Sequence, residues 1–221
     1  MHIPDGFLSI TICILMYAAS IGFLVWAWRK VKNTYSTSVA PLLAISSAFV
    51  FAAQMINFPI MYGTSGHLVG GTFLAVLLGP YAAILSMTLV LMMQALFFAD
   101  GGLTTFGANV FNMAIIGGLS YFVVKALAHE SKSSSRFFLS VFAASWLSIV
   151  GGALVCGLEI GFSPLFADAG GILVTVPAML FWHVVIGLGE ATITATLLTQ
   201  LIRMPSTVLP MFTTFRGGEL K

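Results

Sequence analysis

The chain alternates between long apolar runs and short polar or glycine-rich stretches. Seven of the runs predict helices, since about 20 apolar residues can cross a bilayer as a helix. The third run is short, at about 11 residues or roughly 16 Å of helix, so it predicts a partial span or a helix that begins inside a cavity. The predicted helices cover residues 7–28, 39–57, 68–78, 81–98, 110–127, 137–160 and 172–202.

The composition indicates that the predicted helices lie in a membrane. The chain is 59% hydrophobic and only 7% charged, whereas about 25% of the residues of a soluble domain are charged. The first run, 7–28, is longer than the roughly 7–15 apolar residues of a cleavable signal, so no such signal is expected. The sequence predicts an all-α integral protein of the plasma membrane. It forms one domain over 1–221, with a tip at 1–6, a bundle at 7–202 and a cytoplasmic tail at 203–221.

The basic residues predict the orientation of the bundle. All nine Lys and Arg fall within residues 29–32, 125–136 and 203–221. These stretches share one side of the membrane if seven helices cross it, and the positive-inside rule makes that side the cytoplasm. The amino terminus is then outside and the carboxyl terminus is cytoplasmic. This prediction fails if the short helix at 68–78 does not cross.

The opposite face is expected to collect cations. It holds Asp5, Asp100 and Asp168, and it carries no Lys or Arg. An acidic face without basic residues raises the local concentration of positive ions. The amino terminus and the loop that carries His67 lie on this face.

The first residues contain a chelating dipeptide. An unmodified Met1 amine, the His2 amide nitrogen and the His2 imidazole Nδ1 can reach one cation together, closing a five-membered and a six-membered ring. Three nitrogens held in this way lie in a plane, which suits Ni(II) or Cu(II) and, less strictly, Co(II). Pro4 and Gly6 then turn the chain sharply, so the tip can fold back on the rest of the chain. The alternative is a frayed terminus, because chain ends are usually poorly ordered.

His67 is the candidate for the open corner of this plane. It lies at the outer end of the helix predicted over 68–78, on the same side as Met1 and His2, and glycines flank it. Its imidazole would complete a plane of four nitrogens. The alternative is an ordinary polar residue on an interfacial loop. A plane of four nitrogens favours nickel but does not distinguish nickel from cobalt. Copper would bind more tightly by the general affinity order, so the geometry of the site and the supply of metal must exclude it.

Four motifs resemble one family over essentially the whole chain. They are Met-His-Ile-Pro-Asp-Gly at 1–6, Gly-Thr-Ser-Gly-His-Leu-Val-Gly-Gly at 63–71, Asp-Gly-Gly-Leu-Thr-Thr-Phe-Gly-Ala-Asn at 100–109 and His-Val-Val-Ile-Gly-Leu-Gly-Glu at 183–190. Together they resemble the nickel/cobalt substrate-binding subunit, or S component, of energy-coupling-factor transporters, the CbiM/NikM family. The first two motifs are highly specific.

The resemblance implies a seven-helix substrate-capture protein with one extra amino-terminal helix relative to other such subunits. It also implies that Met1 and His2 insert into the bundle and bind the metal with His67, because these three residues match the family's ligands one by one. Met1 must then be retained and deformylated, and the bulky His2 favours retention by hindering aminopeptidase trimming.

The resemblance also implies partner proteins. The chain has no Gly-x-x-x-x-Gly-Lys-Ser/Thr loop for the phosphates of ATP. Active uptake would therefore need ATP-binding cassette ATPases and a transmembrane coupling (T) subunit, with a small accessory membrane subunit as a further candidate. The lipid bilayer is the other expected partner. No nucleic acid is expected, and no cofactor besides the transported Ni2+ or Co2+.

Four polar residues are candidates for orienting the metal ligands from outside, as outer partners often do: Asp5, Ser65, Asn109 and Asn112. The structural alternative is favoured for each of them. Asp5 would then cap the first helix, and the asparagines would only satisfy loop backbone. His183 and Glu190 lie on one face of the last predicted helix, where an interhelical hydrogen bond is expected for each.

A row of small residues marks a candidate coupling face on the helix predicted over 39–57. Small residues at four-residue spacing let helices pack closely. In the resembled family such a face docks on the coupling subunit, and packing within the bundle explains the row equally well. The row consists of Ala40, Ala44, Ala48 and Ala52.

Other functions are less well supported. A membrane metalloprotease or acyltransferase would need His-Glu-x-x-His or Gly-x-Ser-x-Gly, and the chain has neither. A retinal photoreceptor would need a lysine in the helix at 172–202, which contains none. A self-sufficient metal-ion channel or secondary carrier stays open, although tight ligation slows release without an energy source.

Overall fold

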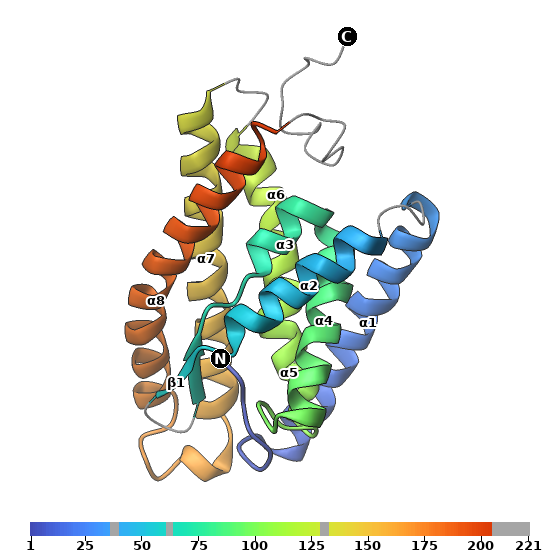
Figure 1. Ribbon diagram of the computed structural model, residues 1–221. Coiled ribbons are helices and arrows are strands. Elements are labelled where there is room, and N and C mark those ends of the chain that lie inside the picture. The colour runs from blue at the N-terminus through green and yellow to red at the C-terminus, as the bar shows by residue number, and fades with distance from the viewer. Residues whose placement is uncertain (36–39, 61–63, 129–132, 205–221) are drawn as a thin grey trace.

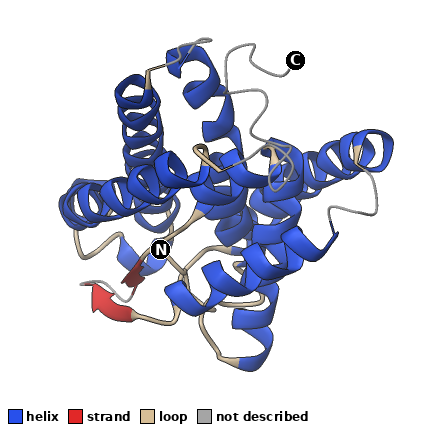
Figure 2. Ribbon diagram, turned by 45° about the horizontal axis from the view of Figure 1, so that its top comes forward, coloured by secondary structure: helices blue, strands red, loops and turns tan. Residues whose placement is uncertain are grey.

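The computed structural model describes residues 1–35, 40–60, 64–128 and 133–204. Helices run between a lower and an upper end, and one small β-hairpin lies beside the amino terminus (Figures 1 and 2). The elements are α1 (Ile10–Thr34), α2 (Ala40–Gln54), β1 (Asn57–Ile60), β2 (Thr64–His67), α3 (Gly71–Leu78), α4 (Pro80–Phe97), α5 (Phe106–Asn109), η2 (Val110–Ile115), α6 (Ile116–Ala128), α7 (Ser134–Gly161), η3 (Pro164–Phe166) and α8 (Ile172–Leu201).

Five helical segments are long and apolar enough to cross a membrane, which confirms the predicted multi-pass membrane protein. They are α1, α4, the continuous stretch Phe106–Ala128, α7 and α8. The other two predicted spans are shorter, since α2 has 15 residues and α3 has only 8. At 1.5 Å per residue, α3 extends about 12 Å. Helix length therefore does not establish seven full crossings.

Several element boundaries differ from the prediction. The helix predicted to stop at residue 28 continues to Thr34, because Lys and Arg are good helix formers and mark a membrane boundary rather than a helix end. The stretch after residue 57, predicted as a loop, contains β1 and β2, which pair antiparallel with Asn57 opposite His67. The helix predicted from residue 110 begins at Phe106 and passes through the π-helical turn η2.

The short helix α3 lies at the centre of the bundle, and all eight of its residues are buried. A Cβ atom on Gly71 would lie 2.7 Å from the Cα of Gly117, so the backbones of α3 and α6 are in direct contact. Gly70 precedes α3 with a φ of 75°, a conformation that favours glycine. The chain therefore turns at Gly70 as it passes from the segment after His67 into α3.

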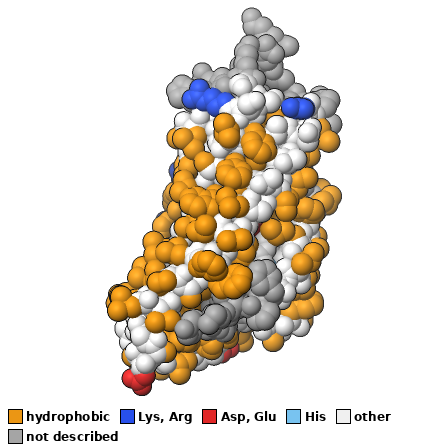
Figure 3. Space-filling view, turned by 90° about the vertical axis from the view of Figure 1, so that its left-hand side faces the viewer, with side chains coloured by type: hydrophobic (Ala, Val, Ile, Leu, Met, Phe, Trp, Pro, Cys, Tyr) orange, Lys and Arg blue, Asp and Glu red, His pale blue; other side chains and the backbone are white. Residues whose placement is uncertain are grey.

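Charge separates between the two ends of the bundle. Figure 3 shows Lys and Arg at the upper end, Asp and Glu at the lower end, and hydrophobic side chains over the surface between them. The described basic residues close α1 and α6, open α7 and follow α8: Arg29, Lys30, Lys32, Lys125, Arg136 and Arg203. Lys132 and the tail from residue 205 lie outside the described residues. The separation agrees with the predicted sidedness, and the end that faces the cytoplasm stays a prediction.

Candidate metal centre

The first three residues are buried inside the lower half of the bundle. Met1 is 1% exposed, His2 3% and Ile3 0%. The Ile3 N–H donates to Asn109 Oδ1 at 2.8 Å, and the Ile3 carbonyl accepts from the Gly102 N–H at 2.9 Å and from Asn109 Nδ2 at 3.1 Å. Main-chain contacts of this kind fix the position of the tip. The terminus is therefore not frayed in the structure.

Glycines make room for the buried tip. A Cβ atom on Gly102 would lie 2.3 Å from the Asp5 nitrogen, and one on Gly101 would lie 3.1 Å from Cδ2 of His2. On α7, a Cβ atom on Gly152 would lie 3.3 Å from Cε of Met1. The glycine-rich loop at 100–109 and one glycine of α7 thus form the seat that receives the tip.

Asp5 holds the tip on this loop. Its carboxylate accepts from the Leu103 N–H at 3.1 Å, from the Thr104 N–H at 2.6 Å and from the Thr104 hydroxyl at 2.5 Å. The hydroxyl and backbone hydrogen bonds hold the pKa of Asp5 below its usual range, against the opposing effect of partial burial. The alternative that Asp5 caps the first helix is wrong, because the side chain of Ser9 caps α1 instead.

The nitrogens of Met1, His2 and His67 lie close together. The Met1 amine is 3.2 Å from His67 Nε2, and the rings of His2 and His67 are 4.6 Å apart between centroids. His67 Nδ1 lies 2.7 Å from the Leu68 carbonyl. A carbonyl only accepts hydrogen bonds, so Nδ1 carries the proton and Nε2 presents its lone pair to the amine.

Burial keeps these nitrogens uncharged. Desolvation lowers the pKa of the Met1 amine from 8.0 to about 6. Desolvation and then the nearby amine lower the pKa of His2 from 6.5 to about 3, and the same causes lower the pKa of His67 well below 6.5. Near pH 7 all three groups are therefore mainly neutral. Neutral nitrogens are the form that binds a metal.

The sequence did not predict the two polar neighbours of His2, Asp100 and Gln94, or the partner of Gln94. Asp100 Oδ1 lies 3.3 Å from His2 Nδ1, and Gln94 Oε1 lies 3.0 Å from His2 Nε2. Gln94 in turn donates to Gln54 at 2.9 Å. The sequence predicts Asp100 only as one of the acids of the outer face. The two glutamines lie within predicted spans, and a buried polar residue in a span is a signal that could have identified them.

The remaining candidates for orienting the ligands have other roles or lie outside the description. Asn109 binds the Ile3 backbone, and Asn112 donates to Oε2 of Glu159 at 2.6 Å. Neither has a described hydrogen bond to the imidazole of His2 or His67. The side chain of Ser65 lies outside the described residues.

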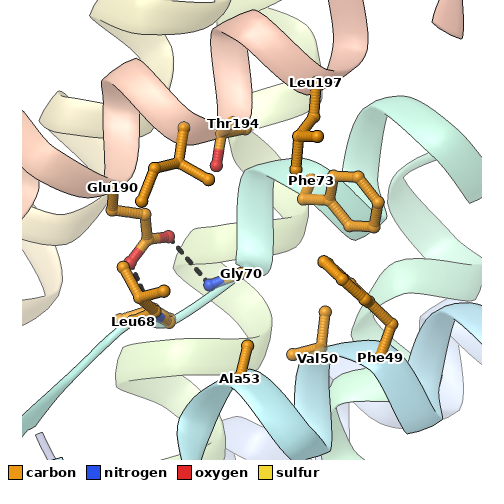
Figure 4. Close-up of a pocket in the computed structure, with 11 residues that line it drawn as sticks. Phe49, Val50, Ala53, Leu68, Gly70, Phe73, Glu190, Thr194 and Leu197 are labelled. Carbon is orange, nitrogen blue, oxygen red and sulfur yellow. Dashed lines mark hydrogen bonds between the residues drawn. The ribbon is translucent and has the colours of Figure 1, made fainter. Parts of the chain in front are cut away.

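The two ionisable residues of α8 differ from each other. The Glu190 carboxylate accepts from the N–H groups of Val69 at 2.5 Å and Gly70 at 2.8 Å, beside a small cavity of about 50 Å³ between α2, α3 and α8 (Figure 4). These bonds reach the backbone that precedes α3 rather than another helix, so the interhelical hydrogen bond expected for Glu190 is not what these two contacts show. His183 Nδ1 instead binds the Met179 carbonyl of its own helix at 2.8 Å, so the described hydrogen bond of His183 is not interhelical.

The small-residue row of α2 faces outward. All four members are exposed: Ala40, Ala44, Ala48 and Ala52. Two large neighbours on the same helix, Ile45 and Phe49, are 69% and 50% exposed. Packing within the bundle therefore does not account for the row.

One group of this candidate donor set is the Met1 amine rather than a side chain. Within residues 1–35, 40–60, 64–128 and 133–204, no three side chains of His, Cys, Asp and Glu form a metal-binding cluster. The buried nitrogens instead combine one amine with two imidazoles. This combination of neutral nitrogen donors suits a divalent ion of the later first-row transition metals.

Known proteins are similar to this chain in sequence. Residues 2–208 match the family described as CbiM, "Cobalt uptake substrate-specific transmembrane region". A provisionally named fused nickel transport protein NikMN of Archaeoglobus fulgidus is 45% identical over 196 residues, covering 88% of this chain and 63% of that protein. The fused nickel transport protein NikMN of Rhodobacter capsulatus is 39% identical over 215 residues, covering 92% of this chain and 62% of that protein.

A solved structure agrees over nearly the full chain. It is described as the crystal structure of a transition metal transporter, with 37% sequence identity and a TM-score of 0.81. The match covers 98% of this chain and 100% of that one. The chain thus spans less than two thirds of the two fused relatives but the whole of this solved chain.

Proposed function

Since the chain belongs to the family of cobalt uptake substrate-specific transmembrane regions, we propose that it is the substrate-binding subunit of an ATP-driven energy-coupling-factor transporter for Ni2+ or Co2+. One observation carries the proposal. The Met1 amine lies 3.2 Å from His67 Nε2, beside the His2 ring, in a buried place where all three groups are mainly neutral near pH 7. A divalent cation would supply the positive charge on which these lone pairs converge.

The proposed coordination uses four nitrogens: the Met1 amine, the His2 amide nitrogen, His2 Nδ1 and His67 Nε2. The His2 amide would release its proton to solvent as the metal binds, so its nitrogen would bind as an anion beside three neutral donors. The ion would replace the hydrogen bond between the amine and His67, and it would draw Nδ1 away from Asp100. The short chelate rings keep three of the donors coplanar, which favours a planar ion such as low-spin Ni(II) over an octahedral one.

Uptake against a gradient would need partner proteins. The chain has no phosphate-binding loop of its own, so we infer ATP-binding cassette ATPases and a transmembrane coupling subunit, with a small accessory membrane subunit as a further candidate. The exposed row Ala40, Ala44, Ala48 and Ala52 supports α2 as the face that meets the coupling subunit. The tip would face the outside, and the basic ends of the helices would face the cytoplasm.

Metal analysis of the purified full-length protein tests the proposed site. We expect one Ni(II) per chain and a low-spin square-planar absorption band. An octahedral spectrum, or the same stoichiometry in a variant that lacks both imidazoles (His2→Ala with His67→Ala), would contradict the coordination.

Reconstituted vesicles test the proposed energy source. The chain alone should bind Ni(II) without concentrating it, and accumulation should require the ATPase and coupling subunits together with ATP. Accumulation by the chain alone, without ATP, would support a self-sufficient carrier instead.

A further inference from the structure

Two glutamines form a hydrogen-bonded relay beneath the proposed site. Gln54 ends α2 and Gln94 lies on α4, and both side chains are fully buried. Gln54 Nε2 donates to the Val69 carbonyl at 2.5 Å, Gln94 Nε2 donates to Gln54 Oε1 at 2.9 Å, and Gln94 Oε1 faces His2 Nε2 at 3.0 Å. The relay thus connects the backbone before α3 with the imidazole of His2.

The first acceptor fixes the direction of every bond in the relay. The Val69 carbonyl has no proton to give, so the NH₂ end of Gln54 must face it. Met87 Sδ, a weak acceptor 3.4 Å away, lies at the same NH₂ end. Gln54 then presents its oxygen to the NH₂ group of Gln94, and Gln94 presents its oxygen to His2. Reversing either amide would set two oxygens or two NH₂ groups against each other.

The start of the relay is held in place. Glu190 accepts from the N–H groups of Val69 and Gly70, so the backbone that carries the Val69 carbonyl is fixed from α8 (Figure 4). The carbonyl therefore cannot turn away from Gln54 without breaking two buried hydrogen bonds, and a buried donor left without its acceptor is costly.

Asp100 favours the opposite arrangement of the His2 proton. Its Oδ1 lies 3.3 Å from His2 Nδ1, and an ionised carboxylate there draws a proton onto that nitrogen. The separation exceeds the roughly 2.7–3.2 Å of an ordinary N–H···O bond, whereas the 3.0 Å contact from Nε2 to Gln94 lies within that range. The observed geometry thus favours the relay over Asp100.

We propose that Gln54 and Gln94 are positioning residues that keep the His2 proton on Nε2, so that Nδ1 stays unprotonated and ready to bind the metal. The consequence for metal binding rests on the proposed function. The position of the proton does not, because every bond of the relay joins two groups of the chain itself. A neutral histidine carries one proton, and its hydrogen-bond partner selects which nitrogen holds it.

The direct test is nitrogen NMR of the metal-free, full-length protein labelled with ¹⁵N-histidine, since protonated and unprotonated ring nitrogens resonate far apart. The His2 signals are assigned by their loss in His2→Ala. We expect a protonated Nε2 and an unprotonated Nδ1. A protonated Nδ1 in the unaltered protein would overturn the proposal, whether or not the protein binds nickel. The expected tautomer in a protein that binds no nickel would instead refute the proposed function alone.

A variant remote from His2 tests the direction of the relay. Gln54→Met keeps the side-chain volume but frees Gln94 to turn over, so Asp100 should draw the proton to Nδ1. Nickel affinity should fall about 10–100-fold, as for loss of other outer partners of a metal ligand. Adding Asp100→Ala should return the proton to Nε2. Ser86→Ala, which alters a buried hydroxyl of α4 outside the relay, should leave the His2 signals unchanged.

The variants separate a positioning role from a structural one. If Gln54→Met only loosened the fold, affinity would fall while the His2 proton stayed on Nε2, and that result would overturn the proposal. If Gln54→Met does not fold, the spectrum of the unaltered protein still decides the case.

Discussion

The polar groups at the two ends of the short segment from His67 to Gly70 have different kinds of partner. At Gly70 and Val69, both N–H groups donate to the Glu190 carboxylate, at 2.8 and 2.5 Å. At His67, Nε2 faces the Met1 amine at 3.2 Å, with the His2 ring beside it. The first end pairs a buried carboxyl group with two N–H donors. The second brings together nitrogens that are mainly neutral near pH 7.

This difference separates a structural contact from a site that a cation would complete. Buried polar groups in proteins are normally hydrogen-bonded, and a buried carboxylate with two N–H donors meets that requirement without a ligand. Neutral nitrogens whose lone pairs converge are stabilised further when a positive ion binds between them. Changes at the two ends should therefore affect different properties: metal binding at His67, and stability at Glu190.

The largest effect is expected for His67→Ala. This change removes one of four proposed nitrogen ligands and the tie between the terminus and β2. Nickel affinity should fall by more than the roughly 100-fold that loss of an outer partner costs, and uptake should be lost while weak three-nitrogen binding remains. Isothermal titration and uptake in cells with the partner subunits measure the two effects. Undiminished uptake would exclude His67 as the fourth ligand.

The next largest effect is expected for Gly102→Ala. The added Cβ would lie 2.3 Å from the Asp5 nitrogen, so the tip could not keep its seat on the loop. Nickel binding should fall sharply even though no ligand changes. Gly189→Ala is the matched control, because nothing lies within 4 Å of a Cβ at that position. Equal binding by the two variants would show that the loop does not position the tip.

A smaller effect is expected from pH. Burial lowers the pKa of the Met1 amine from 8.0 to about 6, so between these values the unseated tip holds more protons than the seated one. Seating should therefore strengthen as pH rises from 6 to 8. Metal binding also releases the His2 amide proton, so as pH falls toward 6 apparent nickel affinity should drop about tenfold per pH unit. Below about 6, protons compete for the amine as well, and the fall should steepen to about a hundredfold per unit. Titrations across pH 5–8 measure this slope. If the plot of apparent nickel affinity against pH changed slope near pH 8 instead of pH 6, the amine would be exposed.

The smallest effect on metal binding is expected for Glu190→Gln. The amide can accept from only one of the two N–H groups, which should cost about 1–3 kcal/mol of stability. Thermal unfolding should detect this loss, while nickel stoichiometry stays at one per chain. Loss of nickel binding with unchanged thermal stability would show that Glu190 serves metal binding rather than stability, contrary to this account.

Local sequence patterns predicted the membrane class and the accumulation of charge at opposite ends, because long apolar runs and basic clusters are local signals. They also predicted that Met1, His2 and His67 lie together, and the structure places them so; metal binding by these residues stays a prediction. The resemblance to a known family contributed the ligand set, which the dipeptide Met1-His2 alone left open.

The sequence did not predict contacts between distant parts of the chain. His2 and Gln94 are 92 residues apart, and no local pattern pairs them. Asp5 reaches residues 103 and 104 rather than the adjacent helix, because Ser9 already caps α1. The hairpin β1–β2 was missed because its strands are only 4 residues long.

The most direct test of the central claim adds one glycine before Met1. The amine then moves one residue away, and the new terminus offers an amine, two amide nitrogens and the His2 imidazole. These four donors complete a plane without His67. Nickel binding and a planar spectrum should survive, and in this extended chain His67→Ala should cost no further affinity.

Uptake should nevertheless fall sharply, because no coordination position remains to tie the terminus to His67 and signal occupancy to the coupling subunit. The measurement pairs metal stoichiometry on purified protein with uptake in cells that carry the partner subunits. Loss of uptake with retained binding is the predicted result. Normal uptake, with mass spectrometry confirming the added glycine, would show that the Met1 amine is not a ligand.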